Sequence, residues 1–389
     1  MEVNRSLEQH IAVFGESGSG KTVLLSSFYG PTQEPGFAKE NLYEVIAESA
    51  SQGLTLHQNY LGMRNDARAP EPNRFRSHSY AFRVKPKVNP DSRAQRAQPV
   101  DNLRLVWHDY PGEWFEQDVE GEEAQRRVDT FRSLLGSDVA FLLVDAQRLI
   151  DNVGQEERYL KSLFSNFRTG LVRLEDEILV GGQPLVEFPR IWVVALSKAD
   201  LLPDLDVQAF KELIVLKAAG ELSMLTDTIR DMVQGGAALS VGDDFVLFSS
   251  AKFSPEKIDL TSPIGLDLIL PLAAILPFER HARWIEQRAA NKLPEKVVEN
   301  LFAGASVLVG LLLTKRFNMP GPVGLVVGLV TSVFSKDVIE GLLNMAREKL
   351  EDARSRALEK KEYFTAVLTG FRLALIEGEE RRVLRLSRR

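Results

Sequence analysis

Short apolar runs alternate with longer amphipathic stretches along the first 277 residues of the chain. The runs are rich in β-branched and aromatic residues, which is typical of buried strands. The stretches at 156–178 and 207–233 carry apolar residues at helical spacing. This alternation predicts an α/β domain with a doubly wound, mostly parallel sheet. The predicted strands lie at 11–14, 79–84, 102–107, 138–146 and at the starts of 193–202 and 245–253.

The pattern changes after residue 277. No run there resembles a strand, and 278–290 and 337–364 are amphipathic at helical spacing. Such helices pack on a neighbouring domain or on a partner helix. We therefore expect two domains, an α/β domain at 1–277 and an all-α C-terminal domain at 278–389.

Residues 301–334 form an unusually apolar stretch within the C-terminal part. Two segments of about a dozen residues flank a polar turn containing "MPGP", and each is shorter than the roughly 20 residues of a membrane-spanning helix. Gly324 and Gly328 are spaced for close helix packing. We expect a helical hairpin, either buried in the core or inserting into a membrane. In the second case the basic end, 381–389, would add attraction to anionic lipid; alternatively, it is a solvated charged tail.

The strand at 11–14 runs into "GESGSGKT" at 15–22, which precedes a helical stretch. This is the phosphate-binding loop pattern in its required context, with a strand before it and a helix after it. Its glycines let backbone N–H groups surround phosphate oxygens, and the helix adds its positive N-terminal end. Lys21 would reach the β- and γ-phosphates, and the Thr22 hydroxyl would ligate Mg²⁺. The nucleotide-binding residues expected here are Gly15, Ser17, Gly18, Ser19, Gly20, Lys21, Thr22 and Val23.

The sequence "DYPGEW" at 109–114 follows the predicted strand 102–107. Asp109 would hold Mg²⁺ through water, since ligands bind at the carboxyl edge of such a sheet. Gly112 would offer its N–H to the γ-phosphate. Glu113 stands next, where it could accept a hydrogen bond from an attacking water. We therefore predict Thr22 and Asp109 as metal ligands, and Lys21, Asp109 and Glu113 as catalytic residues.

Two further strand ends carry residues suited to reading a purine base. Ser197, Lys198 and Asp200 form one group, and a carboxylate at Asp200 would accept from the N1–H and N2–H₂ donors of guanine but not from adenine. The aliphatic stem of Lys198 would cover the base plane. The second group, in "SAK", would place the Ala251 N–H near the guanine O6; its members are Ser250, Ala251 and Lys252.

In this order, each at the end of its own predicted strand, the four motifs resemble those of P-loop GTPases of the translation-factor-related class, which includes Ras-like, dynamin-like and septin-like proteins. The sequence "DYPGEW" most resembles the corresponding stretch of YcjX-like bacterial stress GTPases and of double-GTPase families found beside bacterial conflict genes. The resemblance covers residues 11–277. It implies a Ras-like sheet in which 79–84 and 102–107 form an antiparallel pair, with GTP or GDP and Mg²⁺ as ligands and a stress or defence role.

The chain departs from the Ras-like pattern in switch I. Ras-like proteins carry a threonine there that completes the Mg²⁺ shell. Thr32 lies too close to the first helix for this role, and Thr55 lies in a stretch that reads as helical. The expected switch I, at 64–78, has no threonine. A backbone carbonyl or Asn73 could replace it.

Glu113 is a second departure, since a glutamine orients the attacking water in Ras-like proteins. Its charge is unfavourable near a γ-phosphate unless an arginine or the metal compensates. Three arginines of the switch I segment could do so in cis or across a dimer, although each also suits a solvent-facing basic loop: Arg68, Arg74 and Arg76.

Composition excludes several function classes. The 389-residue chain is 44% hydrophobic and carries a net charge of −6, so we expect an ordinary globular protein. The acidity argues against a nucleic-acid binder as a whole but leaves a local basic patch open. It has no cysteine, which excludes disulfides, thiolate metal sites and cysteine nucleophiles. The five histidines show no metal spacing, and the first residues do not resemble a secretory signal, so we expect a cytoplasmic protein.

These patterns predict a Mg²⁺-dependent, GTP-hydrolysing switch whose nucleotide state controls the helical C-terminal module. That module would act on a protein partner, on a second copy of the chain or at a membrane surface. The main alternative is an interaction module locked in its GTP or GDP form, with negligible hydrolysis. An ATPase that only mimics the base-reading motif is a third hypothesis.

Overall fold

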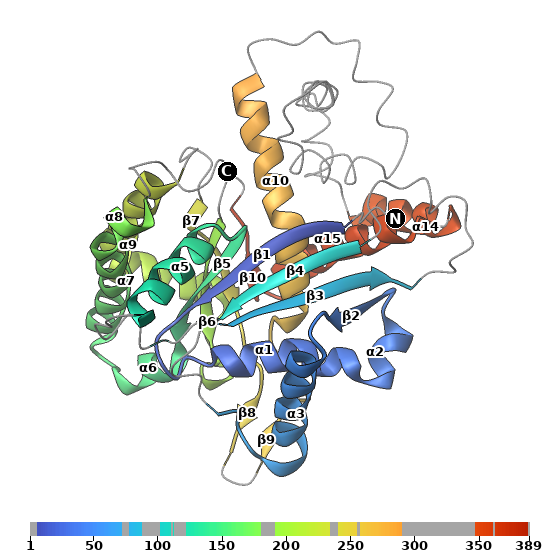
Figure 1. The fold of residues 1–389 in the computed structure, drawn as a ribbon, viewed down its shortest axis with the longest axis horizontal. Helices are drawn as coiled ribbons and strands as arrows, with labels where there is room; N and C mark the ends of the chain where they lie inside the picture. Colours follow the sequence, from blue (N-terminus) through green and yellow to red (C-terminus); the bar gives the residue numbers. More distant parts are fainter. Residues whose placement is uncertain are drawn as a thin grey trace.

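The structure is a computed structural model of the chain, and it describes residues 6–71, 78–87, 102–109, 112, 122–179, 191–233, 240–254, 257–289, 347–360 and 362–387. Its centre is a large twisted sheet (Figure 1). In order across this sheet, the described strands are β10 (Leu384–Arg385), β7 (Ser240–Leu247), β6 (Ile191–Ser197), β5 (Val139–Asp145), β1 (Ser6–Phe14), β4 (Asn102–Asp109), β3 (His78–Pro86) and β2 (Tyr43–Ala47).

The strand pairing confirms the predicted fold class. Strands β4, β1, β5, β6 and β7 run parallel, and β3 pairs antiparallel with β4, as the resemblance implied for 79–84 and 102–107. The order β3-β4-β1-β5-β6-β7 is a Ras-like doubly wound sheet. Two antiparallel edge strands, β2 beside β3 and β10 beside β7, were not predicted from the sequence.

Alternate residues of each central strand enter two separate cores. Ile11 and Val13 of β1 pack on one face, and Ala12 and Phe14 pack on the other. This is the period-two geometry of a strand buried on both faces. The helices of the first face are α1 (Lys21–Tyr29), α3 (Ala50–Asp66), α10 (Ile269–Ala289) and α15 (Tyr363–Glu380), and those of the second face are α5 (Glu122–Leu135), α7 (Glu156–Arg173) and α9 (Val207–Met232).

Shorter elements complete the described architecture. Helix α2 precedes β2, and β8 and β9 form a small antiparallel ribbon after β7. These elements are η1 (Gly30–Gln33), α2 (Pro35–Glu40), α6 (Ala146–Asp151), α8 (Glu175–Ile178), η4 (Ala199–Leu201), β8 (Lys252–Phe253), β9 (Ile258–Asp259), η6 (Leu266–Leu268) and α14 (Arg347–Glu359).

The described C-terminal part is helical apart from β10, which returns the chain to the main sheet. Figure 1 shows α10 passing beside the central strands; α15 packs on α10, and α14 packs on α15. A buried carboxylate fastens this part to β7: Asp244 accepts from Arg280 Nη2 of α10 at 2.6 Å and from the Ser387 backbone N at 2.6 Å. Since α10 runs continuously across residue 277, the division into 1–277 and 278–389 stays a proposal.

The apolar stretch 301–334 lies outside the described residues. Within the described ranges, no helix combines the length and hydrophobicity that crossing a membrane requires.

Candidate nucleotide site

The predicted phosphate-binding loop connects β1 to α1. Gly20 is the N-cap of α1 with φ 91°, and Gly18 has φ 79°, so both adopt backbone that side chains rarely tolerate. Gly15 is required for space instead: a Cβ there would lie 2.4 Å from Ser19 Oγ. The glycine spacing of the motif is therefore the spacing that this curled backbone needs.

Lys21 is buried at the first position of α1. Its ammonium donates to the carbonyl oxygens of Gly15 at 2.7 Å and Glu16 at 3.0 Å. These bonds fold the side chain back over the loop and hold its positive charge inside the turn. A charge held there adds to the positive N-terminal end of the helix and makes the loop attractive to anions.

The Ser19 hydroxyl supplies an independent sign of a ligand. Ser19 is 1% exposed, and its Oγ has no hydrogen-bond partner among the residues that the structure describes. A buried hydroxyl without a partner costs about 1–3 kcal/mol. A phosphate oxygen seated on the loop would remove this cost, so the residues present fit a nucleotide phosphate.

Gly112 of the "DYPG" segment lies against Glu16 and Ser17 of the phosphate-binding loop. Asp109 is 3% exposed at the end of β4, and β4 runs parallel to β1 with His108 opposite Ala12. A Cβ on Gly112 would lie 2.4 Å from the Ser17 backbone N, closer than any side-chain carbon can approach. The backbone at Gly112 therefore lies directly against the phosphate-binding loop, where only glycine fits.

Glu113, Tyr110 and Trp114 lie outside the described residues, so the water-orienting role of Glu113 stays a prediction. The residue before Asp109 is described. Burial, helped by the nearby His10, lowers the pKa of His108 to about 4, and His10 Nδ1 lies 3.0 Å from His108 Nε2. At neutral pH the His108 ring is therefore uncharged and does not neutralise the Asp109 carboxylate.

The first base-reading group is held by residues that the sequence analysis did not single out. Lys198 has the left-handed φ of 54°, and its ammonium pairs with Asp145 Oδ2 at 2.7 Å. Asp145 ends β5, is 4% exposed, and also caps α6 by accepting from the Gln147 backbone N at 2.9 Å. Such strained backbone at a non-glycine residue often marks a functional position. The signal for Asp145 in the sequence is a carboxylate that directly ends an apolar strand.

Asp200 is positioned in a similar way. Its Oδ1 accepts from the Ser249 hydroxyl at 2.6 Å, and the backbone N of the preceding Ala199 donates to Phe248 O at 3.0 Å. The turn carrying Asp200 is thereby fixed to the end of β7. Ser249, the first serine of "SSAKF", is 1% exposed and was also missed, because the motif directs attention to Ser250.

One cavity of about 370 Å³ joins the phosphate-binding loop to both base-reading groups. We call it the loop cavity. Phe253, which is 53% exposed, also lines it, as do Gln147 and Leu201. The predicted residues that line it are Gly18, Ser19, Gly20, Val23, Ser197, Lys198, Asp200, Ser250 and Ala251.

The other predicted residues lie around this cavity rather than in its wall. Lys252 is exposed on β8, opposite Asp259 of β9, and does not line the cavity. Six more predicted residues belong to the loop or the "DYPG" segment without lining the cavity: Gly15, Ser17, Lys21, Thr22, Asp109 and Gly112.

The two threonines between Gly30 and His78 both lie before the expected switch I, and the structure describes both. The Thr32 hydroxyl donates to Tyr29 O at 2.6 Å, and the Thr55 hydroxyl donates to Ser51 O at 3.0 Å within α3. Both hydroxyls are thus engaged with their own helical turns. Arg68 is exposed and pairs with Glu71 at 3.5 Å. Asn73, Arg74 and Arg76 lie outside the described residues.

The residue types suit Mg²⁺ bound with a nucleotide. Within the described ranges, no group of three histidine, cysteine or acidic side chains could hold a metal by itself. Mg²⁺ does not need one, because it keeps several waters and takes one or two protein oxygens plus phosphates. The Thr22 hydroxyl at the start of α1 and the Asp109 carboxylate at the end of β4 are oxygens of this kind.

Comparisons with known proteins add little to this geometry. No protein-family model matches the chain, and no curated protein matches it. Among solved structures, the chain is similar to the GTPase-like domain of Ski7 from S. cerevisiae, bound to GTP in one structure and to GDP and inorganic phosphate in another. The identities are 15% and 14%, the TM-score is 0.28 for each, and the match covers 76% of this chain. The chain spans about half of those structures, 52% of each, and a likeness of this size carries no inference about function.

Proposed function

We propose that the protein binds GTP and GDP with Mg²⁺ and hydrolyses GTP slowly, as a molecular switch. One observation carries this proposal: a single cavity connects the phosphate-binding loop to Asp200 and to Ala251, which stand at the ends of two neighbouring strands. A nucleotide has its phosphates and its base at opposite ends. The loop cavity offers anion-binding groups at one end and hydrogen-bonding groups at the other.

At the phosphate end, backbone N–H groups and Lys21 bind and orient the β- and γ-phosphates. Bound Mg²⁺ would neutralise developing negative charge, with Thr22 and Asp109 as its protein oxygens. Gly112 would direct its N–H toward the γ-phosphate, and its contact with Ser17 supports this placement. Glu113 would hold the attacking water. Positioning and electrostatic stabilisation supply most of the catalysis in reactions of this class.

At the base end, Asp200 would select guanine. Ser249 engages its Oδ1 at 2.6 Å and so fixes the orientation of the carboxylate. Guanine presents two donors to a carboxylate, whereas adenine presents an acceptor. A buried polar partner left unmatched costs enough to discriminate strongly. Phe253 would stack on the base from the open side, since it is exposed and lines the cavity.

A specific observation favours a second candidate, an interaction module locked in one nucleotide state. The hydroxyls of Thr32 and Thr55 both donate to carbonyls of their own helical turns, and neither residue lines the loop cavity, so neither is placed to complete a Mg²⁺ shell there. Without that ligand, sensing of the γ-phosphate and its hydrolysis would both weaken. In either case the helical part would respond to the nucleotide state through η6. This short helix contacts α1, which follows the phosphate-binding loop, and it also contacts α10 and α15. A protein partner, a dimer, membrane contact and a stress or defence role follow only from this proposal and from the family resemblance.

The decisive experiment measures binding of GTP, GDP and ATP to the full chain by calorimetry, followed by phosphate release. We expect guanine nucleotides to bind at least about tenfold more tightly than ATP, a difference of roughly 1.4 kcal/mol or more. Asp200→Ala should abolish this preference while retaining some affinity. Asp204→Ala, which removes an exposed carboxylate from the same loop, is the matched control and should leave the preference unchanged.

Equal affinity for GTP and ATP in the unaltered protein would exclude the guanine assignment. Guanine binding without measurable phosphate release would favour the locked module over the hydrolysing switch.

A further inference from the structure

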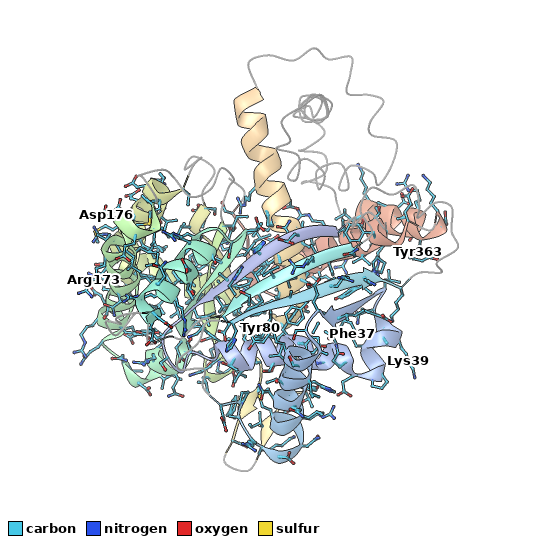
Figure 2. The ribbon with its side chains drawn as sticks, in the orientation of Figure 1. Phe37, Lys39, Tyr80, Arg173, Asp176 and Tyr363 are labelled. Atoms are coloured by element: carbon cyan, nitrogen blue, oxygen red, sulfur yellow. The ribbon has the colours of Figure 1, made fainter. Side chains whose placement is uncertain are left out.

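A second cavity, of about 400 Å³, lies between the α/β part and the C-terminal helices. We call it the helix cavity. Its walls come from eight described elements, drawn from the N-terminal and C-terminal parts of the chain: α1, η1, α2, β2, η6, α10, α14 and α15. Phe37 of α2 and Tyr363, at the start of α15, lie at the same end of the sheet (Figure 2). The main apolar side chains of the walls are Phe28, Phe37, Leu42, Tyr43, Leu270 and Phe371.

Among the described residues that line the helix cavity, one side chain is cationic. Arg354 of α14 lines the helix cavity, and its buried Nε has no hydrogen-bond partner among the described residues. A Cβ on Gly370 would lie 3.7 Å from both Arg354 Nε and Cζ, so the guanidinium rests on α15 where the glycine leaves room. In the described ranges, Arg354 makes neither an ion pair nor a hydrogen bond.

The Arg354 side chain is half-buried, and its buried Nε loses contact with water, a cost that an anion paired with the guanidinium would offset. A guanidinium presents five donors in a planar fork that matches a carboxylate. Burying a polar group without a partner costs about 1–3 kcal/mol, and more for a charged one. Neither neighbouring carboxylate forms an ion pair with Arg354. Glu40 is exposed, and Asp267 pairs with Arg381 at 2.5 Å.

We propose that the helix cavity binds a small amphipathic carboxylate, with its apolar body between α1, α2 and α15 and its carboxylate on Arg354. The volume suits a small ligand, since such pockets measure about 300–1,000 Å³ and are mostly apolar with a few placed polar groups. Glu40 and Asp267 also line the cavity. Their negative charges disfavour a doubly charged head group, so a carboxylate binds better than a phosphate.

Isothermal titration of the full chain with decanoate tests this assignment. We expect saturable binding of one decanoate per chain. Decanol is neutral and decyltrimethylammonium is a cation, so neither can pair with the Arg354 guanidinium as a carboxylate would. Each should bind at least about tenfold more weakly than decanoate, because a charge-assisted hydrogen bond contributes roughly 1.5–3 kcal/mol. Decyl phosphate should bind more weakly than decanoate at pH 8, where its head group carries two charges.

Two variants locate the ligand. Arg354→Met keeps the length of the side chain without its charge and should weaken decanoate binding about tenfold while leaving decanol unchanged. Arg356→Met is the matched control, because Arg356 lies on the same helix but is exposed and paired with Asp352. Ala374→Phe, which fills the cavity from α15, should abolish binding of decanoate and decanol alike.

Thermal denaturation of each variant establishes that it is folded before binding is compared. The proposal is overturned if decanoate gives no saturable heat, if decanol binds as tightly as decanoate, or if folded Arg354→Met binds decanoate as the unaltered protein does.

Discussion

The loop cavity and the helix cavity have nearly the same size, about 370 and 400 Å³, but they are built in different ways. The loop cavity is formed by turns at the carboxyl ends of β1, β6 and β7, and each turn carries a recognisable motif. The helix cavity is formed by the sides of helices from both ends of the chain, and its residues form no motif. Of two cavities with nearly the same volume, therefore, one could be predicted from sequence motifs and the other could not.

Helix α1 connects the two cavities. It begins at Lys21 in the phosphate-binding loop, and Ser27 and Phe28, near its other end, line the helix cavity. Its nine residues span about 14 Å. If the two cavities are separate sites, changes in one should leave binding at the other nearly unaffected. The following predictions test this separation, from the largest expected effect to the smallest.

Lys21→Ala should give the largest effect. Removing the ammonium that holds the loop should weaken GTP and GDP binding about 100-fold, since bonds from a charged group contribute roughly 1.5–3 kcal/mol each. Calorimetry with both nucleotides measures the loss, and decanoate titration of the same variant should be unchanged. Lys39→Ala, an exposed position on α2, is the control for loss of a positive charge (Figure 2). A loss of nucleotide affinity below about threefold in Lys21→Ala would contradict the role of the loop.

Asp145→Asn should weaken guanine nucleotide binding about tenfold. The change removes the charge that pairs with Lys198 at 2.7 Å, so the strained turn before Asp200 loses its support. Asp145 acts by positioning, so the preference for GTP over ATP should fall together with the affinity, which a purely structural defect would not cause. Asp176→Asn, on the exposed surface of α8, is the control. Unchanged base preference would show that the ion pair is not needed for recognition.

Phe253→Ala should have a moderate effect of about fivefold on GDP affinity, because stacking of a base on an aromatic ring contributes roughly 1–3 kcal/mol and Phe253 is partly solvated. Its 53% exposure means that the fold should not change, and the thermal midpoint should stay within error. The measurement is GDP titration at constant salt. Val153→Ala, at a position that is 76% exposed and does not line the loop cavity, serves as the comparison.

The smallest effect concerns Tyr43 in the helix cavity. Burial, with a smaller contribution from the charge of Asp267, raises the pKa of Tyr43 to about 12 from its ordinary value of 10. The folded state therefore keeps this proton while the unfolded state loses it. The stability due to Tyr43 is complete below pH 10 and is lost as the pH rises toward 12.

The free energy of unfolding should decrease between pH 8 and pH 11. In Tyr43→Phe this decrease should be smaller by about 1 kcal/mol than in the unaltered chain. Urea unfolding at these two pH values measures it. Tyr80, whose pKa is also raised to about 12 by burial, contributes a similar slope of its own and remains in the variant. An identical slope in Tyr43→Phe and the unaltered chain would mean that Tyr43 is not buried in solution.

The strand pattern could be predicted because periodicity is local. Apolar runs such as 138–146 identified the buried strands, and the glycines of 15–22 identified the loop. The edge strands β2 and β10 were missed for a physical reason. Both are short, β2 is only partly buried, and β10 has two residues whose pairing with β7 depends on contacts made from the far end of the chain.

Within the candidate site, the motif residues were predicted and their supports were not. Asp145 and Ser249 carry no motif of their own, and they matter because parallel pairing of β5, β6 and β7 brings them beside Lys198 and Asp200. The prediction for Lys252 placed it with the base-reading group, whereas it is exposed on β8 and outside the cavity wall.

By itself, the sequence determined the α/β class, the glycine-rich turn at 15–22 and the order of the strand-end motifs, because backbone conformation and burial periodicity are properties of neighbouring residues. Only the tertiary structure decided that Gly112 lies against Ser17, that Asp145 holds Lys198, and that Arg354 lies over Gly370 beside a cavity. Each of these contacts joins residues that are distant in the chain. Their proximity is a result of packing the whole sheet and its helices, which no local pattern encodes.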